Sequence, residues 1–133
     1  MDLTLSVVCD DARERSDGKI DFVGVFDELR APGFPAVQDR MTVVLTLAWE
    51  AEEAGRQPIR ADLMDPDDEM VLTIQGHTDV PRPRPDDPRR PITRIIMPLE
   101  NVVFPRPGLY HFRLTAAGGV RRACSLHVGE ADG

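Results

Sequence analysis

The feature that most constrains this chain is a two-residue alternation of apolar and polar side chains, which recurs in short segments between turn residues. A period of two places successive side chains on opposite faces of an extended strand, whereas an amphipathic helix needs a period of about 3.6. No segment of about ten residues keeps the helical period, so we expect an all-β protein. The strongest strand is 41–49, whose apolar face consists of Met41, Val43, Leu45, Leu47 and Trp49.

About eight segments have strand character, and Gly, Pro and Asp residues separate most of them. The charged segment 10–16 interrupts the first alternation and has room for one helical turn. Asp17-Gly18, 65–68 and Gly118-Gly119 are expected to be hairpin turns. In chain order the strand segments are 3–9, 19–26, 41–49, 59–63, 69–76, 92–99 with a short apolar run at 102–104, 109–115 and 120–128.

These strands predict an antiparallel two-layer β-sandwich with Greek-key-type connections, with a closed barrel as the alternative. Two long connections, 27–40 and the Pro/Arg-rich segment 77–91, are expected to cross between the sheets. The length of 133 residues fits a single domain over 1–133. Residues 129–133 are expected to form a flexible tail.

The alternation also predicts which side chains face the core. On the first strand these are Leu3, Leu5, Val7 and Cys9, and on the last they are Val120, Cys124, Leu126 and Val128. Between them, Tyr110, Phe112 and Leu114 are expected to point inward, with the Tyr110 hydroxyl returning to the backbone as a corner tyrosine.

Three further positions have predicted roles in packing. Gly24 interrupts an apolar face, which indicates a bulge or the close approach of a neighbouring strand. Phe34 is expected to cover one end of the core. The second face of the strongest strand, formed by Thr42, Val44, Thr46 and Ala48, carries no charge, so we expect that strand to be central in its sheet.

The charge balance excludes some classes of partner. Sixteen basic and 23 acidic residues give a net charge of −7, which opposes binding to nucleic acids and to anionic membranes. The first residues carry no secretory signal, so we expect a cytoplasmic protein with reduced thiols. Cys9 and Cys124 are therefore interpreted as small buried apolar residues, with a redox role or a structural bridge as alternatives.

No catalytic, cofactor or metal site is predicted. His77, His111 and His127 lack zinc-ligand spacing. A turn centred on residue 119 would place His111 opposite His127, as exposed side chains or as a metal-binding or pH-sensing pair. Calcium is the alternative interpretation of the loop carboxylates, which also fit ordinary turns. These carboxylates are Asp10, Asp11, Asp65, Asp67 and Asp68.

The Pro/Arg-rich segment is the most distinctive stretch of the sequence. Its prolines recur at nearly every second or third position, which favours an extended conformation and excludes a helix. The functional interpretation is an exposed, stiff ligand for a groove or for an acidic partner, and the alternative is a rigid crossing loop. The candidate interaction residues are Arg82, Arg84, Arg89 and Arg90.

Three motifs resemble a bacterial family that is known only as a domain of unknown function. They are Cys9-Asp10-Asp11-Ala12, the segment from Asp17 to Asp27 with Ala31-Pro32-Gly33-Phe34-Pro35-Ala36, and the segment from Phe104 to Leu114. The resemblance covers most of the chain. It implies a bacterial, cytoplasmic β-sandwich and transfers no activity.

The sequence favours a non-enzymatic binding or assembly module that acts through sheet edges or end loops, because no convergent catalytic set is visible. Its partner would be an unidentified protein or, as a homo-oligomer, a second copy that uses the uncharged face of 41–49. The alternative is a metal-dependent or hydrolytic enzyme that uses loop carboxylates. A carrier of small ligands, which would require an apolar cavity between the sheets, ranks last.

Overall fold

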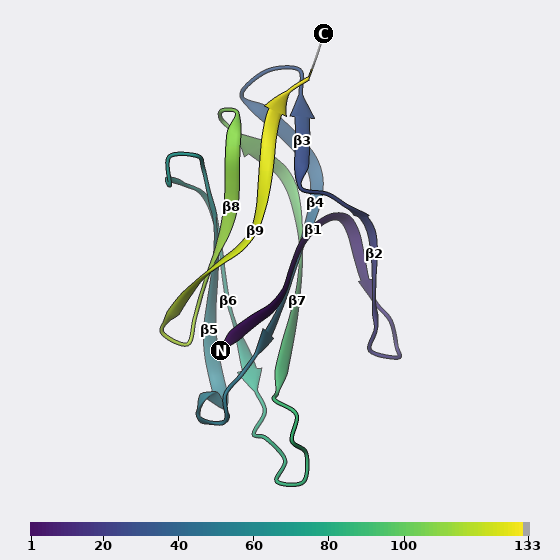
Figure 1. Cartoon of the computed structure of the whole chain (residues 1–133), viewed down its shortest axis with the longest axis vertical. Coiled ribbons are helices and arrows are strands. Elements are labelled where there is room, and N and C mark those ends of the chain that lie inside the picture. The colour runs from purple at the N-terminus through teal and green to yellow at the C-terminus, as the bar shows by residue number, and fades with distance from the viewer. Residues whose placement is uncertain (132–133) are drawn as a thin grey trace.

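The computed structural model describes residues 1–131, which form nine β-strands and one short 3-10 helix (Figure 1). The all-β expectation is therefore confirmed at the level of fold class. The elements are β1 (Asp2–Glu14), β2 (Ile20–Val25), β3 (Glu28–Ala31), β4 (Ala36–Ala48), η1 (Ala51–Glu53), β5 (Gly55–Met64), β6 (Met70–Val80), β7 (Ile92–Phe104), β8 (Gly108–Ala116) and β9 (Gly119–Glu130).

The strands form two sheets. Sheet A has the order β2-β1-β4-β7, and sheet B has the order β3-β9-β8-β5-β6. All pairs are antiparallel except β3 with β9, which run parallel and correct the expectation of a wholly antiparallel fold. The finer expectation of a two-layer sandwich with Greek-key-type connections stays a prediction.

One hydrophobic core joins the two sheets. The apolar face of β4 supplies its largest share, and all five side chains predicted from 41–49 are buried there. β4 lies between β1 and β7, so its predicted central position is confirmed. Phe34 packs against the core from the connection after β3. Sheet B contributes, among others, Leu63, Tyr110, Phe112, Leu114, Leu126 and Val128.

The predicted corner tyrosine is present at the start of β8. The Tyr110 hydroxyl donates a hydrogen bond to the Arg106 carbonyl at 2.6 Å and accepts one from the Arg106 amide at 3.2 Å. Its ring packs edge-to-face on Phe104, with 5.0 Å between ring centroids. These contacts join the end of β7 to β8 while the ring fills the core.

A bulge in β1 changes the predicted inward face. The register between β1 and β4 shifts between Leu3 and Leu5, and a bulge moves every later side chain to the opposite face. Val8 therefore faces the core, whereas Leu5 and Val7 pair with outward-facing residues of β4. The prediction that Leu3, Leu5, Val7 and Cys9 share the core face was wrong for the last three.

The charged segment 10–16 continues β1 rather than forming a helical turn. β1 runs to Glu14, turns through 15–19 and returns as β2. Figure 1 shows that β1 curves over before this hairpin, which then runs alongside the rest of sheet A. Arg94 of β7 donates a hydrogen bond to the Gly18 carbonyl in the hairpin turn at 2.7 Å. The Arg94 guanidinium also lies 3.8 Å from the Glu14 carboxylate.

The uncharged second face of β4 is consequently buried within the chain. Thr42, Val44, Thr46 and Ala48 are each at most 8% exposed. This overturns the reason given for self-association through that face, because no second copy can reach these side chains in the folded chain. Cys9 is buried beside Thr42 on the same side of the sheet.

The predicted close approach at Gly24 is confirmed. Gly24 has φ of +63°, and a Cβ built there would lie 2.1 Å from Oδ2 of Asp10 on the neighbouring β1. Glycine accepts this conformation because it has no Cβ to collide with its own backbone.

The β8–β9 hairpin differs from the prediction by its turn and register. Its two turn residues are Ala117 and Gly118, both with positive φ, and Ala116 pairs with Gly119. A further shift in β9 leaves Val120 58% exposed, although it was expected to face the core. Leu126 and Val128 are buried as predicted, and Cys124 packs against the core.

Two connections are shorter than the sequence indicated. The segment 27–40 contains β3 and the start of β4, and the Pro/Arg-rich crossing narrows to 81–91 because β6 continues to Val80. Strand β9 continues through Glu130, so the prediction of a flexible tail over 129–133 was wrong for residues 129 and 130. Residues 132–133 lie outside the described residues.

Candidate functional site

An open seam lies between the edge strands β6 and β7. Each of these strands has a neighbour within its own sheet on one side only, β5 for β6 and β4 for β7. Their remaining edges border the same side of the molecule, where a cleft of about 370 Å³ lies between the sheets. We call this cleft, with its two strand edges, the seam.

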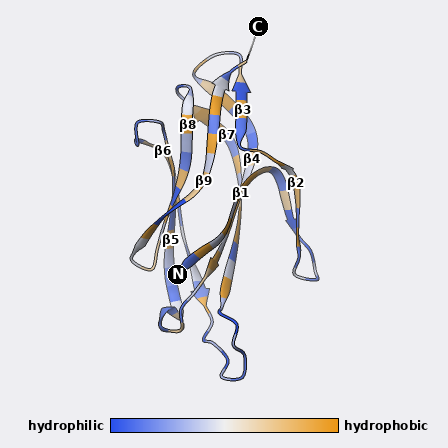
Figure 2. Ribbon diagram, viewed as in Figure 1, coloured by the Kyte–Doolittle hydropathy of each residue, from blue (hydrophilic) through white to orange (hydrophobic). Residues whose placement is uncertain are grey.

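The floor and walls of the seam are mainly apolar. Leu45 of β4 and Ile59 of β5 line its floor, Ile74 lines the β6 wall, and Ile95 and Met97 line the β7 wall. All except Leu45 are only partly buried. Figure 2 shows hydrophobic residues along β7, which contrast with the hydrophilic connection 81–91 at its lower end.

Strand β6 has few of the usual devices that block pairing with another strand, and its one bulge lies at its start, where Leu72 pairs with Leu63 and Met70 with Met64. Proteins protect sheet edges with prolines, inward-pointing charges, bulges or short strands. β6 has 11 residues, contains no proline and has Asp79 as its one carboxylate. Gly76 in its middle is exposed, and a Cβ built there would meet no atom within 4 Å. A glycine in this position leaves the backbone open to another chain.

Strand β7 is a less accessible edge. It has Pro98 near its middle, which has no amide hydrogen to donate. On the same strand, the guanidinium of Arg94 already contacts the Gly18 carbonyl and the Glu14 carboxylate of the β1–β2 hairpin. The β6 edge is therefore the more favourable position for an added strand.

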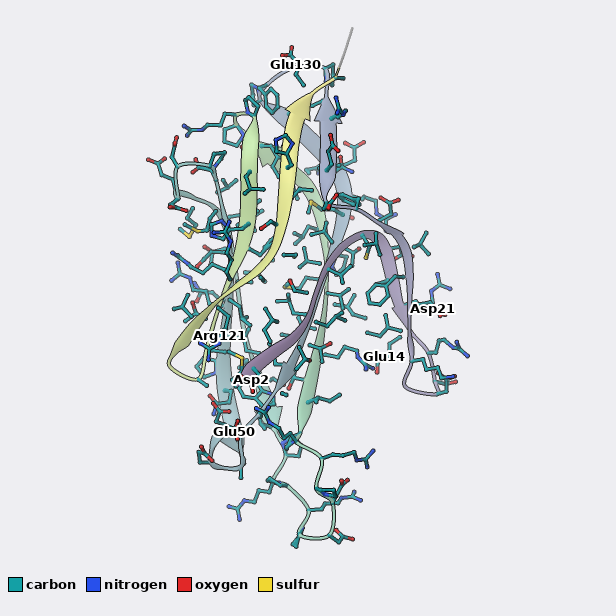
Figure 3. The ribbon with its side chains drawn as sticks, in the orientation of Figure 1. Asp2, Glu14, Asp21, Glu50, Arg121 and Glu130 are labelled. Atoms are coloured by element: carbon teal, nitrogen blue, oxygen red, sulfur yellow. The ribbon has the colours of Figure 1, made fainter. Side chains whose placement is uncertain are left out.

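The Pro/Arg-rich connection is anchored next to the seam by Arg90. Its guanidinium contacts the carboxylates of Asp2 at 2.7 Å and Glu50 at 2.8 Å, and it donates to the carbonyls of Ala48 and Trp49. The Trp49 amide in turn donates to the Pro91 carbonyl at 2.9 Å. Figure 3 shows Asp2 and Glu50 at the end of the molecule from which this connection extends.

The four predicted arginines of this connection have different roles. Arg89 forms a bidentate pair with Asp87, whose pKa is lowered to about 2 by these hydrogen bonds. Arg90 is the anchor. Arg82 and Arg84 are exposed, and within residues 1–131 neither forms an ion pair. All four border one hollow of about 540 Å³ beneath the connection.

Two more basic side chains extend this region along the β5–β6 pair. Arg56 lies 3.1 Å from Nδ1 of His77, and both are exposed. Arginine has no acceptor, so the ring nitrogen accepts this hydrogen bond. His77 also lines the seam.

Of the carboxylates considered for calcium, Asp65, Asp67 and Asp68 lie in the turn between β5 and β6, whereas Asp10 and Asp11 lie within β1. Oδ1 of Asp65 accepts the amides of Asp67 and Glu69, and Oδ2 accepts from Arg106 at 3.0 Å. These hydrogen bonds, first that of Glu69, lower the pKa of Asp65. Arg106 also pairs with Asp67. Within residues 1–131, no three His, Cys, Asp or Glu side chains are grouped to hold a metal ion.

A buried carboxylate on β5 was not predicted. Asp62 is 1% exposed and accepts hydrogen bonds from Arg60 at 2.9 Å, Thr73 at 2.7 Å and Arg113 at 3.2 Å. Burial opposes ionisation of Asp62, but the three donors outweigh it, so its pKa is lowered. The signal in the sequence is an aspartate between two apolar residues of a strand, Ala61 and Leu63. We call Asp62 and its three donors the clamp.

The histidine and cysteine predictions have clear outcomes. His111 pairs with Ser125 and His127 with Leu109, so the predicted His111–His127 pair was wrong, because the turn lies earlier than predicted and β9 has an extra residue between Arg122 and Ser125. Both cysteines are free thiols. Burial is the main factor that raises the pKa of each thiol, which fits their interpretation as apolar packing residues.

Comparisons with known proteins place the chain in a family and leave its activity open. Among residues 1–131 the structure contains no helix of the length and apolar character that a membrane crossing requires. No curated protein matches the sequence. Residues 4–129 match the model of a family described as "Family of unknown function (DUF6941)", and this chain belongs to that family.

Proposed function

We propose that this protein is a non-enzymatic binding module that takes up an extended polypeptide segment at the seam, as an additional strand on the edge of β6. The observation that carries the proposal is the combination of a long, nearly uncharged, unpaired strand edge with an apolar cleft beside it. In strand addition, backbone hydrogen bonds supply affinity, and pockets for alternate side chains supply specificity.

The seam provides both components. The free edge of β6 offers backbone donors and acceptors in register with a new strand. Alternate side chains of that strand would point into the cleft toward Ile59, Ile74 and Met97. Burial of apolar surface there contributes about 25 cal/mol per Å² before the costs of association.

The experiment selects peptides from a random 12-residue library displayed on phage and synthesises the enriched sequences. We expect them to bind the wild-type chain and to slow hydrogen exchange of β6 amides. The variant Gly76→Val places a branched side chain on the cleft face of β6, opposite Ile59, where it would occupy space that the bound segment needs. We expect it to weaken binding by about tenfold or more without loss of stability, because no atom lies within 4 Å of the added Cβ.

The matched control is Gly33→Val, a glycine with similarly open surroundings in the 32–35 connection. We expect this variant to bind like wild type. The proposal is wrong if the selected peptides protect other strands, or if Gly76→Val binds them as tightly as the control does.

A further inference from the structure

We infer that the segment bound at the seam carries acidic residues at the end that lies beside the 81–91 connection. This inference rests on the proposed function, because it specifies the chemistry of the segment that β6 would receive. It starts from the contrast between local and overall charge. Residues 81–94 contain five arginines and two aspartates, whereas the whole chain has a net charge of −7.

The connection that carries these arginines lies at one end of the seam. The connection joins the last residue of β6, Val80, to the first residue of β7, Ile92, so it forms one end of the cleft between those strands. A strand added along β6 must therefore have one of its ends next to this connection. Arg56 and His77 lie on the approach, on the β5–β6 pair.

The internal pairing of the connection leaves two cations for a partner. Arg90 is held by Asp2 and Glu50, and Arg89 by Asp87, and these contacts fix the shape of the connection. Arg82 and Arg84 border the same hollow without an ion pair of their own within residues 1–131. Their forked guanidinium groups match the two oxygens of a carboxylate.

Prolines make this arrangement suitable for recognition. Pro81, Pro83 and Pro85 alternate with the two arginines. Because proline restricts the backbone before any partner arrives, holding Arg82 and Arg84 in place costs little additional entropy on binding. The stretch lacks aromatic residues between its arginines, so it has no platforms for stacking nucleic-acid bases.

The test uses six synthetic peptides with the same alternating Val/Thr strand of about eight residues and a tail of two Glu, two Gln or two Lys residues. Each tail is placed at either end of the strand, since parallel and antiparallel addition bring opposite ends to the connection. We expect one of the Glu peptides to bind about tenfold more tightly than its Lys counterpart, with Gln between them. Salt of about 0.5 M should reduce this difference to about twofold.

The charge-reversal variant Arg82→Glu/Arg84→Glu should invert the preference, so that the Lys peptide binds more tightly. Arg122→Glu changes an exposed arginine on β9 and serves as the matched control, which should keep the wild-type order. Both variants replace exposed side chains, and their unfolding by urea checks that they remain folded.

The outcomes separate this inference from the proposed function. If the peptides bind and Gly76→Val blocks them, but Glu and Lys tails bind equally, the acidic preference is wrong and strand addition stands. If no peptide binds in a manner sensitive to Gly76→Val, strand addition itself is wrong. An oligothymidylate that competes as well as the Glu peptide would overturn the choice of an acidic polypeptide.

Discussion

The two sheets are connected differently at the two sides where their edge strands meet. On one side β2 and β3, the edge strands of the two sheets, are joined by the two residues Phe26 and Asp27. Phe26 and Leu29 pack against the core there. On the other side β6 and β7 are joined by the 11 residues of 81–91, and the cleft lies between them.

The edge strands also differ in length between the two sides. On the closed side β2 and β3 have six and four residues, whereas on the open side β6 and β7 have 11 and 13. Short edges offer few unpaired backbone groups to another chain, and long ones offer many. One side therefore holds the two sheets together, while the other has the length and exposure that pairing with a further strand requires.

The largest expected effect comes from truncating an apolar side chain on each side. Phe26→Ala should lower the free energy of unfolding by about 2–3 kcal/mol, because Phe26 packs against the core. Ile74→Ala should cost about 1 kcal/mol, because Ile74 already faces an open cleft. Urea unfolding measures both, and equal losses would contradict the distinction between the two sides.

Sequence reasoning recovers the structure best where the alternation is long and regular. The face of 41–49 was predicted in full, because nine successive residues of one period leave a single consistent orientation. β1 shows the limit. Its bulge after Leu3 inserts one extra residue, and nothing in Leu3-Thr4-Leu5-Ser6 distinguishes a bulged strand from a regular one.

The candidate site could be predicted only in part, because its contacts join residues that are far apart in the sequence. Proline spacing predicted an extended connection with exposed arginines at 82, 84, 89 and 90. It did not show that Arg90 serves as an anchor, because its partners Asp2 and Glu50 are 88 and 40 residues away in the sequence. The seam was invisible because it depends on which strands become edges, and strand order follows from the packing of the whole chain.

The second-largest expected effect comes from the clamp, which attaches the edge strand β6 to β5. The clamp links β5 to both of its neighbours, since Thr73 lies on β6 and Arg113 on β8. Asp62→Asn removes the charge that these donors satisfy and should lower the free energy of unfolding by about 2 kcal/mol at pH 7. The control substitution Asp79→Asn, at an exposed aspartate of β6, should leave the free energy of unfolding nearly unchanged.

The pH dependence of this effect has a defined sign. The pKa of Asp62 is lower in the folded chain than its ordinary value of 3.8. Its stabilising contribution is therefore complete above that value and is lost as the pH falls through the folded pKa. The difference between wild type and Asp62→Asn should shrink below about pH 4. A constant difference from pH 7 to pH 2.5 would show that the charge of Asp62 does not stabilise the fold.

The smallest effect is also the most direct test of the comparison, because one substitution is made in two environments. Gly24→Ala on β2 should cost about 1–2 kcal/mol, since alanine is strained at φ of +63° and its Cβ would meet the Asp10 side chain. Gly76→Ala on β6 should raise the free energy of unfolding by about 0.5 kcal/mol, because its Cβ enters open space and the unfolded chain loses freedom. Opposite signs in urea unfolding would show that Gly24 stabilises the fold, while Gly76 is kept at a cost in stability. If Gly76→Ala were as destabilising as Gly24→Ala, the open edge of β6 would have a structural role, and its glycine could no longer be attributed to the approach of another chain.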